Sequence, residues 1–389
     1  MKESIIIRKL GPISNLEIPE IKQLTVLIGK SSTGKSAVMK TIAMMRYIFK
    51  RENIKSYLKN SNIKKPPIRT GIKNISKLGS LLTSNTEIIY KVTIESTEYT
   101  LTCKNLKIEV SPKAISKKDL TFIKGSYISE SRSFIPSMIE KIVSNRNVKL
   151  GFYEDETLKD FDESTNVEIR KIGFMNMDVK VKKSPSKGKQ FFIENKDQSF
   201  DLKDSSSGIR NVVPVEAITE YFASEDFSFK EAFNRSVLQY LLDSENLEFF
   251  QPVKSVNDLR KVIQIHIEEP EISLDPISQT GIIRDLVSTT FNKHCADRMF
   301  STILTTHSPY ILNYLNVLIE RYNKNPNDEI GLDPDKIAAY RIEDGTATNI
   351  VTKDEELDNR IVIDTAWFSD SMEKIYSEYE DLVTNQINQ

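Results

Sequence analysis

The alternation of apolar and polar residues predicts strands near the N-terminus, followed by a helix. Residues 4–10 and the polar–apolar segment 16–21 have the pattern of strands, and residues 24–28 form an uninterrupted apolar run. Beyond residue 35, apolar residues recur at helical spacing at Val38, Ile42, Met45 and Phe49. The pattern predicts a buried strand that leads into a helix with one face packed on a sheet.

The middle of the chain alternates between strand-like and helical segments. Three short alternating segments between residues 90 and 110 predict an antiparallel meander with one solvent-exposed face. Residues 125–143 predict a short buried strand, a polar loop and a helix, and the acidic stretch that follows, to about residue 170, predicts another helix. A further small set of strands is expected between residues 179 and 202.

Two apolar runs in the C-terminal half predict buried parallel strands. They are residues 262–267 and 300–304, and a helix is expected to begin near Ile209, after the serine-rich stretch 204–208. Ligands bind at the carboxyl edge of doubly wound sheets, so residues just beyond these strands are candidates for chemistry.

Length and composition describe a globular chain. Its 389 residues allow two or three domains or one elaborated α/β domain, with 39% apolar and 28% charged residues. No apolar run is long enough to span a bilayer, and the N-terminal residues lack the apolar core of a signal peptide. Two distant cysteines, Cys103 and Cys295, favour a reducing, cytoplasmic setting.

The net charge of −1 hides an uneven distribution. Residues 40–77 contain many basic residues against the single acid Glu52, whereas residues 354–381 lean acidic. The basic residues are Lys40, Arg46, Lys50, Arg51, Lys55, Lys59, Lys64, Lys65, Arg69, Lys73 and Lys77. Two interpretations stay open for this block, a solvated surface or a contact with nucleic acid or an acidic partner.

A phosphate-binding loop follows the first buried strand. Residues 29–36 match G-x-x-x-x-G-K-[ST], between a predicted strand and a predicted helix. Gly29 and Gly34 let the backbone curl so that N–H groups point at phosphate oxygens, and the helix start adds its dipole. Lys35 can reach the β- and γ-phosphates, and the Ser36 hydroxyl is placed to ligate Mg²⁺.

Carboxylates and a histidine follow the two later strands. Glu268 and Glu269 end the run 262–267, where one carboxylate can hold the Mg²⁺ shell while the other orients the attacking water. His307 follows the run 300–304 in the position of a γ-phosphate sensor. Backbone N–H groups and hydroxyls at the serine-rich helix start also suit a γ-phosphate, although an ordinary N-cap would have the same sequence.

The order of these motifs resembles the ABC-type ATPase head, and more closely the AAA-family ATPases of the SMC, RecF and overcoming-lysogenisation (OLD) class. The segments that carry the resemblance are 7–13, 206–214, 267–276 and 304–316, and it covers roughly residues 1–50 and 120–345. It implies an α/β fold, an ABC-type (RecF/SMC/OLD-like) P-loop ATPase head with a mixed central sheet, an antiparallel β subdomain and a helical insertion.

In that class two heads enclose two ATP molecules, so each site is composite. The resemblance implies that Glu268 replaces the Mg²⁺-binding aspartate, Glu269 is the catalytic base and His307 the switch histidine. Lys35 and Ser36 would act in cis, with ATP and Mg²⁺ as cofactors. The expected nucleotide contacts are Gly29, Lys30, Ser31, Ser32, Thr33, Gly34, Lys35, Ser36, Ala37, the D-loop acid Asp275, and, from the opposite subunit, Ser206, Ser207 and Gly208.

Two departures from the family pattern concern the site. Glu268 is one methylene longer than aspartate, and no glutamine stands in the expected Q-loop region, where Ser131 and Arg132 are the nearest candidates. The resemblance divides the chain into a head, two insertions and an acidic C-terminal segment. These are the head 1–50, 120–146 and 200–345, the basic and antiparallel-β insertion 51–119, the helical/β insertion 147–199, and the segment 346–389.

The sequence after Tyr310 is too short for the Toprim nuclease domain of OLD proteins, and His266, His294 and His307 all lie in or beside the ATPase core. Long SMC arms are also absent. A bare head resembles the ATPase subunits of bacterial anti-phage defence systems such as PARIS and Septu. That resemblance implies a dimer or higher oligomer that controls a separate effector, such as a nuclease. The alternative is a RecF-like DNA clamp that uses residues 40–77, and a transporter subunit fits poorly.

Overall fold

The computed structural model of the chain describes residues 1–63, 78–142, 152–166, 169–184, 188–195, 198–242, 247–291, 297–355 and 359–387. Cys295, His294 and the basic residues from 64 to 77 lie outside these ranges. Among the described residues, none of the helices is both long and apolar enough to cross a bilayer.

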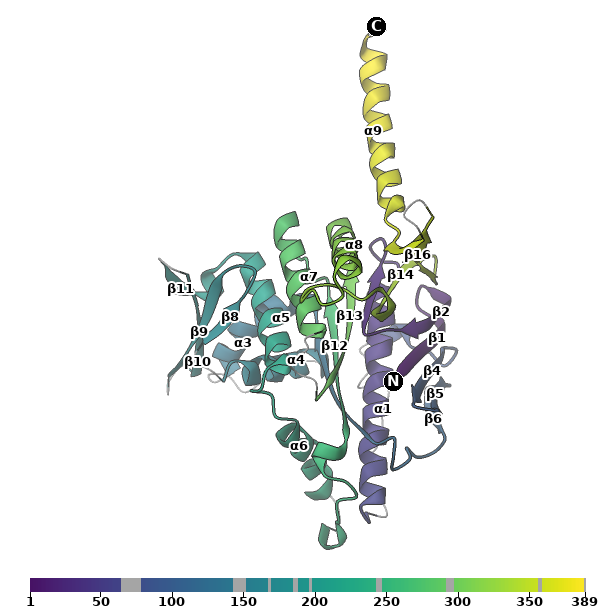
Figure 1. Ribbon diagram of the computed structural model, residues 1–389, viewed down its shortest axis with the longest axis vertical. Coiled ribbons are helices and arrows are strands. Elements are labelled where there is room, and N and C mark those ends of the chain that lie inside the picture. The colour runs from purple at the N-terminus through teal and green to yellow at the C-terminus, as the bar shows by residue number, and fades with distance from the viewer. Residues whose placement is uncertain are drawn as a thin grey trace.

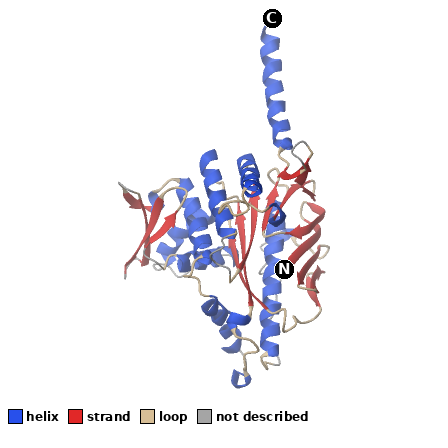
Figure 2. Ribbon diagram, viewed as in Figure 1, coloured by secondary structure: helices blue, strands red, loops and turns tan. Residues whose placement is uncertain are grey.

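A six-stranded mixed sheet forms the centre of the molecule (Figures 1 and 2). Its strand order is β15-β14-β3-β13-β12-β7, with parallel neighbours except at the β14–β15 edge. The strands are β3 (Leu24–Ile28), β7 (Thr121–Ile128), β12 (Arg260–Glu268), β13 (Met299–Thr306), β14 (Ile337–Glu343) and β15 (Thr346–Asn349). Continuous burial of β3, β12 and β13 explains their unbroken apolar sequences, and the two predicted C-terminal strands are confirmed.

Helices follow the central strands and pack on or beside the sheet. The predicted helix after the P-loop is confirmed as α1, which contacts β3, β7, β12 and β13. Helix α7 follows β12 and α8 follows β13, and these two helices pack against each other. The bounds are α1 (Lys35–Asn60), α5 (Ser207–Ala223), α7 (Pro276–Thr290) and α8 (Pro309–Lys324).

The predicted meander is confirmed, but it does not stand alone. Its strands continue a five-stranded antiparallel sheet of order β2-β1-β4-β5-β6, so residues from the segment 51–119 pair with the N-terminal strands. Alternating burial along β4 matches its alternating sequence. The strands are β1 (Lys2–Leu10), β2 (Ile13–Ile21), β4 (Glu87–Ile94), β5 (Thr97–Lys104) and β6 (Lys107–Ser111).

A helical part and a small sheet lie on the β7 side of the molecule. The sheet has the order β11-β10-β9-β8. The predicted strand at residues 200–202 ends at Asp201, because Leu202 begins a short 3₁₀ turn. The elements are α3 (Ile135–Ile142), α4 (Phe152–Ser164), β8 (Ile169–Ile172), β9 (Met177–Ser184), β10 (Gly188–Glu194), β11 (Ser199–Asp201) and α6 (Phe229–Leu242), with 3₁₀ turns at Gly79–Leu81, Glu130–Phe134, Leu202–Asp204, Leu247–Phe249, Val256–Asp258 and Pro334–Lys336.

The acidic C-terminal segment contains strands as well as a helix. After β15, a two-stranded ribbon of β16 (Val351–Asp354) and β17 (Arg360–Ile363) leads to α9 (Ala366–Ile387). Helix α9 projects from the body of the molecule (Figure 1). Its direction is opposite to that of α1, which runs from the P-loop toward the other end of the molecule.

A buried polar network joins α1 to both main sheets. The Arg46 guanidinium donates to Glu3 at 2.8 Å, to Ser301 at 2.8 Å and to Nε2 of His266 at 3.2 Å. Because Nδ1 of His266 faces the Ser126 carbonyl at 3.0 Å, Nδ1 carries the proton and Nε2 accepts. Burial, and then the charge of Arg46, lower the pKa of His266 to about 3. His266 is therefore a neutral core residue.

Candidate functional site

The P-loop connects the end of β3 to the start of α1 and curls as the glycines predict. Gly34 has a φ of +100°, a conformation that side chains with a Cβ rarely adopt, and Ser32 also has a positive φ. A Cβ added to Gly29 would lie 2.3 Å from the Ile342 carbonyl oxygen on β14. The neighbouring strand therefore leaves room for glycine alone at the first position of the loop.

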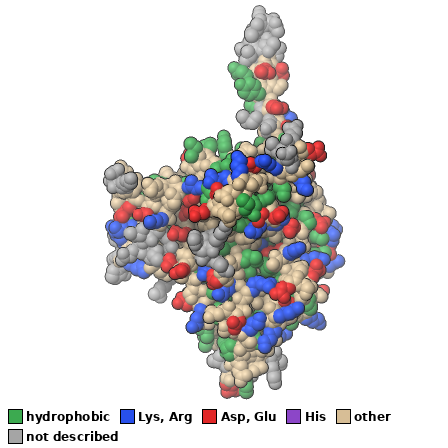
Figure 3. Space-filling view, viewed as in Figure 1, with side chains coloured by type: hydrophobic (Ala, Val, Ile, Leu, Met, Phe, Trp, Pro, Cys, Tyr) green, Lys and Arg blue, Asp and Glu red, His purple; other side chains and the backbone are tan. Residues whose placement is uncertain are grey.

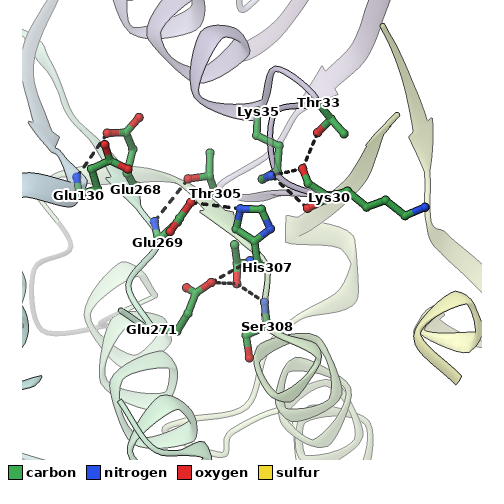
Figure 4. Close-up of polar contacts among 12 residues, drawn as sticks. Lys30, Thr33, Lys35, Glu130, Glu268, Glu269, Glu271, Thr305, His307 and Ser308 are labelled. Carbon is green, nitrogen blue, oxygen red and sulfur yellow. Dashed lines mark hydrogen bonds and ion pairs between the residues drawn. The ribbon is translucent and has the colours of Figure 1, made fainter. Parts of the chain in front are cut away.

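Lys35 closes the loop from inside. Its Nζ donates to the carbonyl oxygens of Gly29 at 3.0 Å and Lys30 at 2.8 Å, and the Thr33 hydroxyl donates to Lys30 at 3.0 Å (Figure 4). Burial lowers the pKa of Lys35, against the opposing charges of Glu269 and Glu271. A buried ammonium that is held by two carbonyl oxygens can transfer these bonds to phosphate oxygens.

Glu269 and His307 meet opposite Lys35 at the carboxyl edge of the sheet (Figure 4). Nε2 of His307 lies 3.1 Å from Oε1 of Glu269, and both side chains are about a third exposed or less. Glu269 has a φ of +43°, which is costly for a residue with a side chain, and its N–H donates to the Thr305 carbonyl at 2.9 Å. The fold holds Glu269 in this conformation beside the strand that carries His307.

Glu271 holds Thr306 and the backbone of His307 beside Glu269, a role that was not predicted from the sequence. Its Oε1 accepts from the Thr306 hydroxyl and from the His307 backbone N–H, both at 2.7 Å. Burial raises the pKa of Glu271. In the sequence, only the position of Glu271 two residues after Glu269 could have indicated this role.

Glu268 points away from the P-loop lysine. Its carboxylate lies 3.3 Å from Nζ of Lys40 and accepts from the Glu130 N–H at 3.3 Å. The side chain is 3% exposed, and its Oε1 accepts no hydrogen bond with good geometry despite the nearby ammonium. Lys40, one turn after Ser36 on α1, is therefore a second residue of the site that sequence reasoning assigned only to the basic block.

The donor set fits Mg²⁺ in part. Among the described residues, no cluster of three or more histidine, cysteine or acidic side chains could hold a metal by itself. Mg²⁺ is usually bound by one or two carboxylates together with phosphate oxygens and waters, so such a cluster is not required. The under-satisfied oxygen of Glu268 is a suitable outer ligand, and Ser36 lies at the start of the same helix as Lys40.

Arg132 connects three parts of the site. Its fully buried guanidinium donates to the carbonyl oxygens of Glu268 at 2.6 Å, Glu269 at 2.7 Å and Asn211 at 2.9 Å, and to Ser129 at 3.2 Å. Burial lowers its pKa to about 10, against the neighbouring glutamates. These bonds go to backbone, so Arg132 positions the acidic strand end against α5. Ser131, the other Q-loop candidate, is exposed.

The serine-rich stretch begins α5, as predicted. Ser206 is the N-cap, and its hydroxyl accepts from the Ile209 N–H at 3.4 Å. A Cβ on Gly208 would lie 2.8 Å from the Ser273 carbonyl, so this helix start packs closely on the loop before Asp275. Asp275 caps α7 through the N–H groups of Ile277 and Ser278. Within the chain, the side chains of Ser206 and Asp275 both form capping bonds, and the start of α5 approaches the loop before Asp275 at Gly208.

The structure therefore brings Lys35, Glu269 and His307 together, whereas Glu268 points toward Lys40 on α1. Ser206, Ser207, Gly208 and Asp275 form a separate part of the same edge, connected to the acids by Arg132. The side chains of Ser206 and Ser207 at this helix start are exposed, and a helix N-terminus is suited to binding an anion.

Comparisons with solved structures find heads of SMC proteins. An "SmcHead bound to the C-winged helix domain of ScpA" is 8% identical with a TM-score of 0.43, and the match covers 90% of this chain and 97% of that one. An SMC head domain from Thermotoga maritima is 9% identical with a TM-score of 0.37, over 90% and 98%. An Smc head domain with an extended coiled coil, bound to the C-terminal domain of ScpA derived from Pyrococcus furiosus, is 8% identical with a TM-score of 0.41, over 97% and 99%.

No protein-family model and no curated protein matches the sequence. Similarity to solved structures at this level concerns the fold alone. The chemistry of the site therefore rests on the residues described above.

Proposed function

We propose that the chain is an ATP-binding and ATP-hydrolysing head that associates with a second copy around ATP and controls a separate effector. The observation that supports it most is the meeting of the P-loop lysine, Glu269 and His307 at one edge of the sheet. A strained backbone at Glu269 and a glycine-only contact at Gly29 are features of a site under functional constraint.

The residues have distinct roles in this proposal. The loop from Gly29 to Ser36 and Ala37 binds the phosphates, and Lys35 exchanges its carbonyl partners for β- and γ-phosphate oxygens. Ser36 and, as an outer ligand, Glu268 would hold Mg²⁺, and the ion would supply charge neutralisation. Glu269 accepts the proton of the attacking water as the water oxygen bonds to the γ-phosphorus. The bond from the γ-phosphorus to the β–γ bridging oxygen breaks, ADP leaves with that electron pair, and the His307 Nε2–H holds the Glu269 carboxylate in place.

The second copy completes the site. Ser206 and Ser207 are exposed at the start of α5, where their hydroxyl groups can face the γ-phosphate of a second copy, and the buried Gly208 lets this helix start pack closely on the loop before Asp275. Contact with the partner's nucleotide would shift α5, and Arg132 would transmit the shift to the backbone of Glu269.

We place this head in bacterial anti-phage defence, in the cytoplasm, with a nuclease as the effector. The support is the resemblance of the motif order to PARIS- and Septu-type ATPase subunits. Cells that carry the gene with its neighbours should resist phage, and Lys35→Ala should abolish resistance without lowering the protein level.

The activity is tested by phosphate release from the purified chain with ATP and Mg²⁺. Lys35→Ala should lose nucleotide binding, and Glu269→Gln should bind ATP but hydrolyse it at least about 100-fold more slowly, the usual scale of general-base catalysis. Glu271→Gln is a matched control, because it keeps the hydrogen bonds from Thr306 and His307 and changes a neighbouring carboxylate. Normal hydrolysis by Glu269→Gln would contradict the assignment of the base.

The basic block supports the DNA-clamp alternative weakly. Lys40 pairs with Glu268, Arg46 is buried in the core, and Lys55 pairs with Glu52. Burial also lowers the pKa of Lys50 to about 8. Most of the described basic residues of the block are thus bonded within the molecule. Arg46 in particular is buried, so it belongs neither to a solvated surface nor to a nucleic-acid contact. A salt-dependent gain in DNA affinity with ATP would restore the clamp hypothesis.

A further inference from the structure

Helix α9 carries large apolar side chains that nothing in the described chain covers. Ile375, Tyr376, Tyr379 and Leu382 are 64%, 66%, 62% and 62% exposed. Figure 3 shows hydrophobic side chains gathered along one side of the projecting helix. An isolated helix of 22 residues has little stability of its own in water, so a partner that buries this side is expected.

The exposed side chains form one stripe with helical spacing. Ile375, Tyr379 and Leu382 stand at i, i+4 and i+7, the spacing of a seam between two helices. At about 100° per residue, the charged residues of the helix all lie about 100° or more around its axis from Tyr379. They are Asp370, Glu373, Lys374, Glu378, Glu380 and Asp381.

This charge pattern selects the kind of partner. Five acids against one lysine make nucleic acid and anionic lipid unfavourable ligands of the helix. A basic protein would bind the acidic side and leave the stripe uncovered. A second stripe of the same kind would bury the apolar side chains of both helices, and the charged residues would stay in water on the outer sides.

The base of α9 is fixed beside the nucleotide-binding edge. Trp367 stacks on Phe368 at 3.7 Å, and the Arg341 guanidinium lies 5.9 Å from the Trp367 ring. Arg341 pairs in register with Ile28, the residue before the P-loop. Asn316 of α8 exchanges two hydrogen bonds of 2.8 Å with Ile363, at the end of the strand before α9.

From this base α9 extends away from the body, opposite to the direction in which α1 leaves the P-loop (Figure 1). At 1.5 Å per residue its 22 residues reach about 33 Å. A second head that faces the P-loop edge would therefore lie on the side to which α9 points, and the second copy's α9 would point back toward the first.

We infer that α9 is an arm that pairs with the α9 of a second copy through Ile375, Tyr379 and Leu382, with Tyr376 at the flank. The orientation of the second copy rests on the proposed head dimer, but the pairing itself does not require nucleotide. Two helices with so short a stripe bury less than the roughly 1,600 Å² of a standard interface, so the arms associate weakly alone and strengthen the pairing of heads by raising their effective concentration.

The test is the monomer–dimer equilibrium of the full chain, measured by analytical ultracentrifugation without nucleotide and with ATP and Mg²⁺. The double variant Ile375→Asp/Leu382→Asp should raise the dissociation constant at least about tenfold in both conditions, since two charges then enter the seam. The control Ser377→Asp adds a charge on the opposite side of the same helix and should leave the dissociation constant unchanged.

The Lys35→Ala variant separates the two proposals. If it still dimerises, and the seam substitutions abolish that dimer, the arms pair independently of ATP. If ATP drives dimerisation of the wild type while the seam substitutions change neither condition, the arm inference is wrong and the head proposal stands. Seam-dependent dimers that ATP does not strengthen would contradict the head proposal and leave the arm inference intact.

Discussion

Replacing Arg132 with methionine tests how the acidic strand end is held. Methionine keeps the apolar stem of arginine but has no donor, so the buried Glu268 carbonyl loses a bond of 2.6 Å. The Glu269 carbonyl loses a bond of 2.7 Å but still accepts from the Ile272 N–H at 3.2 Å. An unsatisfied buried acceptor costs about 1–3 kcal/mol, so the Glu268 carbonyl alone predicts a loss of about 1–3 kcal/mol in the free energy of unfolding. Urea denaturation of the full chain measures this loss.

The turnover rate of an Arg132→Lys variant shows whether Arg132 positions Glu269 or only stabilises the fold. With Arg132→Lys, the charge remains but one ammonium cannot make the four bonds of the guanidinium, so Glu269 shifts while the P-loop is unchanged. A shift of about 1 Å can cost up to about 100-fold in rate, so turnover should fall at least about tenfold with little change in the KM for ATP.

Arg235→Met is the control, because Arg235 is 55% exposed and pairs only at the surface with Glu163, where such a pair contributes about 0–1 kcal/mol. The urea denaturation and the turnover of ATP are both measured at a temperature where every variant is folded. An Arg132→Lys protein with normal turnover per folded molecule would refute the positioning role.

Two further predictions concern single residues. Gly29→Ala places a Cβ 2.3 Å from the Ile342 carbonyl, so ATP affinity, measured with a fluorescent nucleotide, should fall at least about tenfold. Gly125→Ala, whose added Cβ meets no atom within 4 Å, should leave the ATP affinity unchanged. Burial, and then Asp285 and Glu220, raise the pKa of Glu216 well above its usual value. The native state therefore binds this proton more tightly than the unfolded state, and stability is lost as pH rises from about 4.5 through the raised pKa. Glu216→Gln should raise the melting temperature at pH 7.5 and lose that advantage near pH 4; an equal gain at both pH values would contradict this explanation.

The local elements of the fold could be predicted because each has a local cause. The apolar run of β12 reflects burial on both faces, and the glycines of the P-loop reflect positive φ and a close backbone contact. The pairing of β4 with β1 could not be predicted, because it joins segments about 80 residues apart and its register depends on the assembled sheet.

The site was predictable in its motifs and less so in its supports. Lys35, Glu269 and His307 stand at strand ends that topology brings to one edge. The partners of Arg132 are backbone carbonyls, which leave no trace in the sequence, and Lys40 looked like one member of a basic block. The apolar stripe of α9 was hidden by the acidic composition of its segment.

The central claim is that each ATP site is built from two copies, and mixing two inactive variants tests it most directly. Lys35→Ala removes phosphate binding in its own chain, and Ser207→Arg blocks the helix start offered to the partner. Neither variant should hydrolyse ATP alone. In a mixture, the P-loop of the Ser207→Arg chain meets the intact helix start of the Lys35→Ala chain, so hydrolysis should reappear. Full activity of Ser207→Arg alone, or no recovery in a mixture whose mixed dimers are verified by mass, would contradict a composite site.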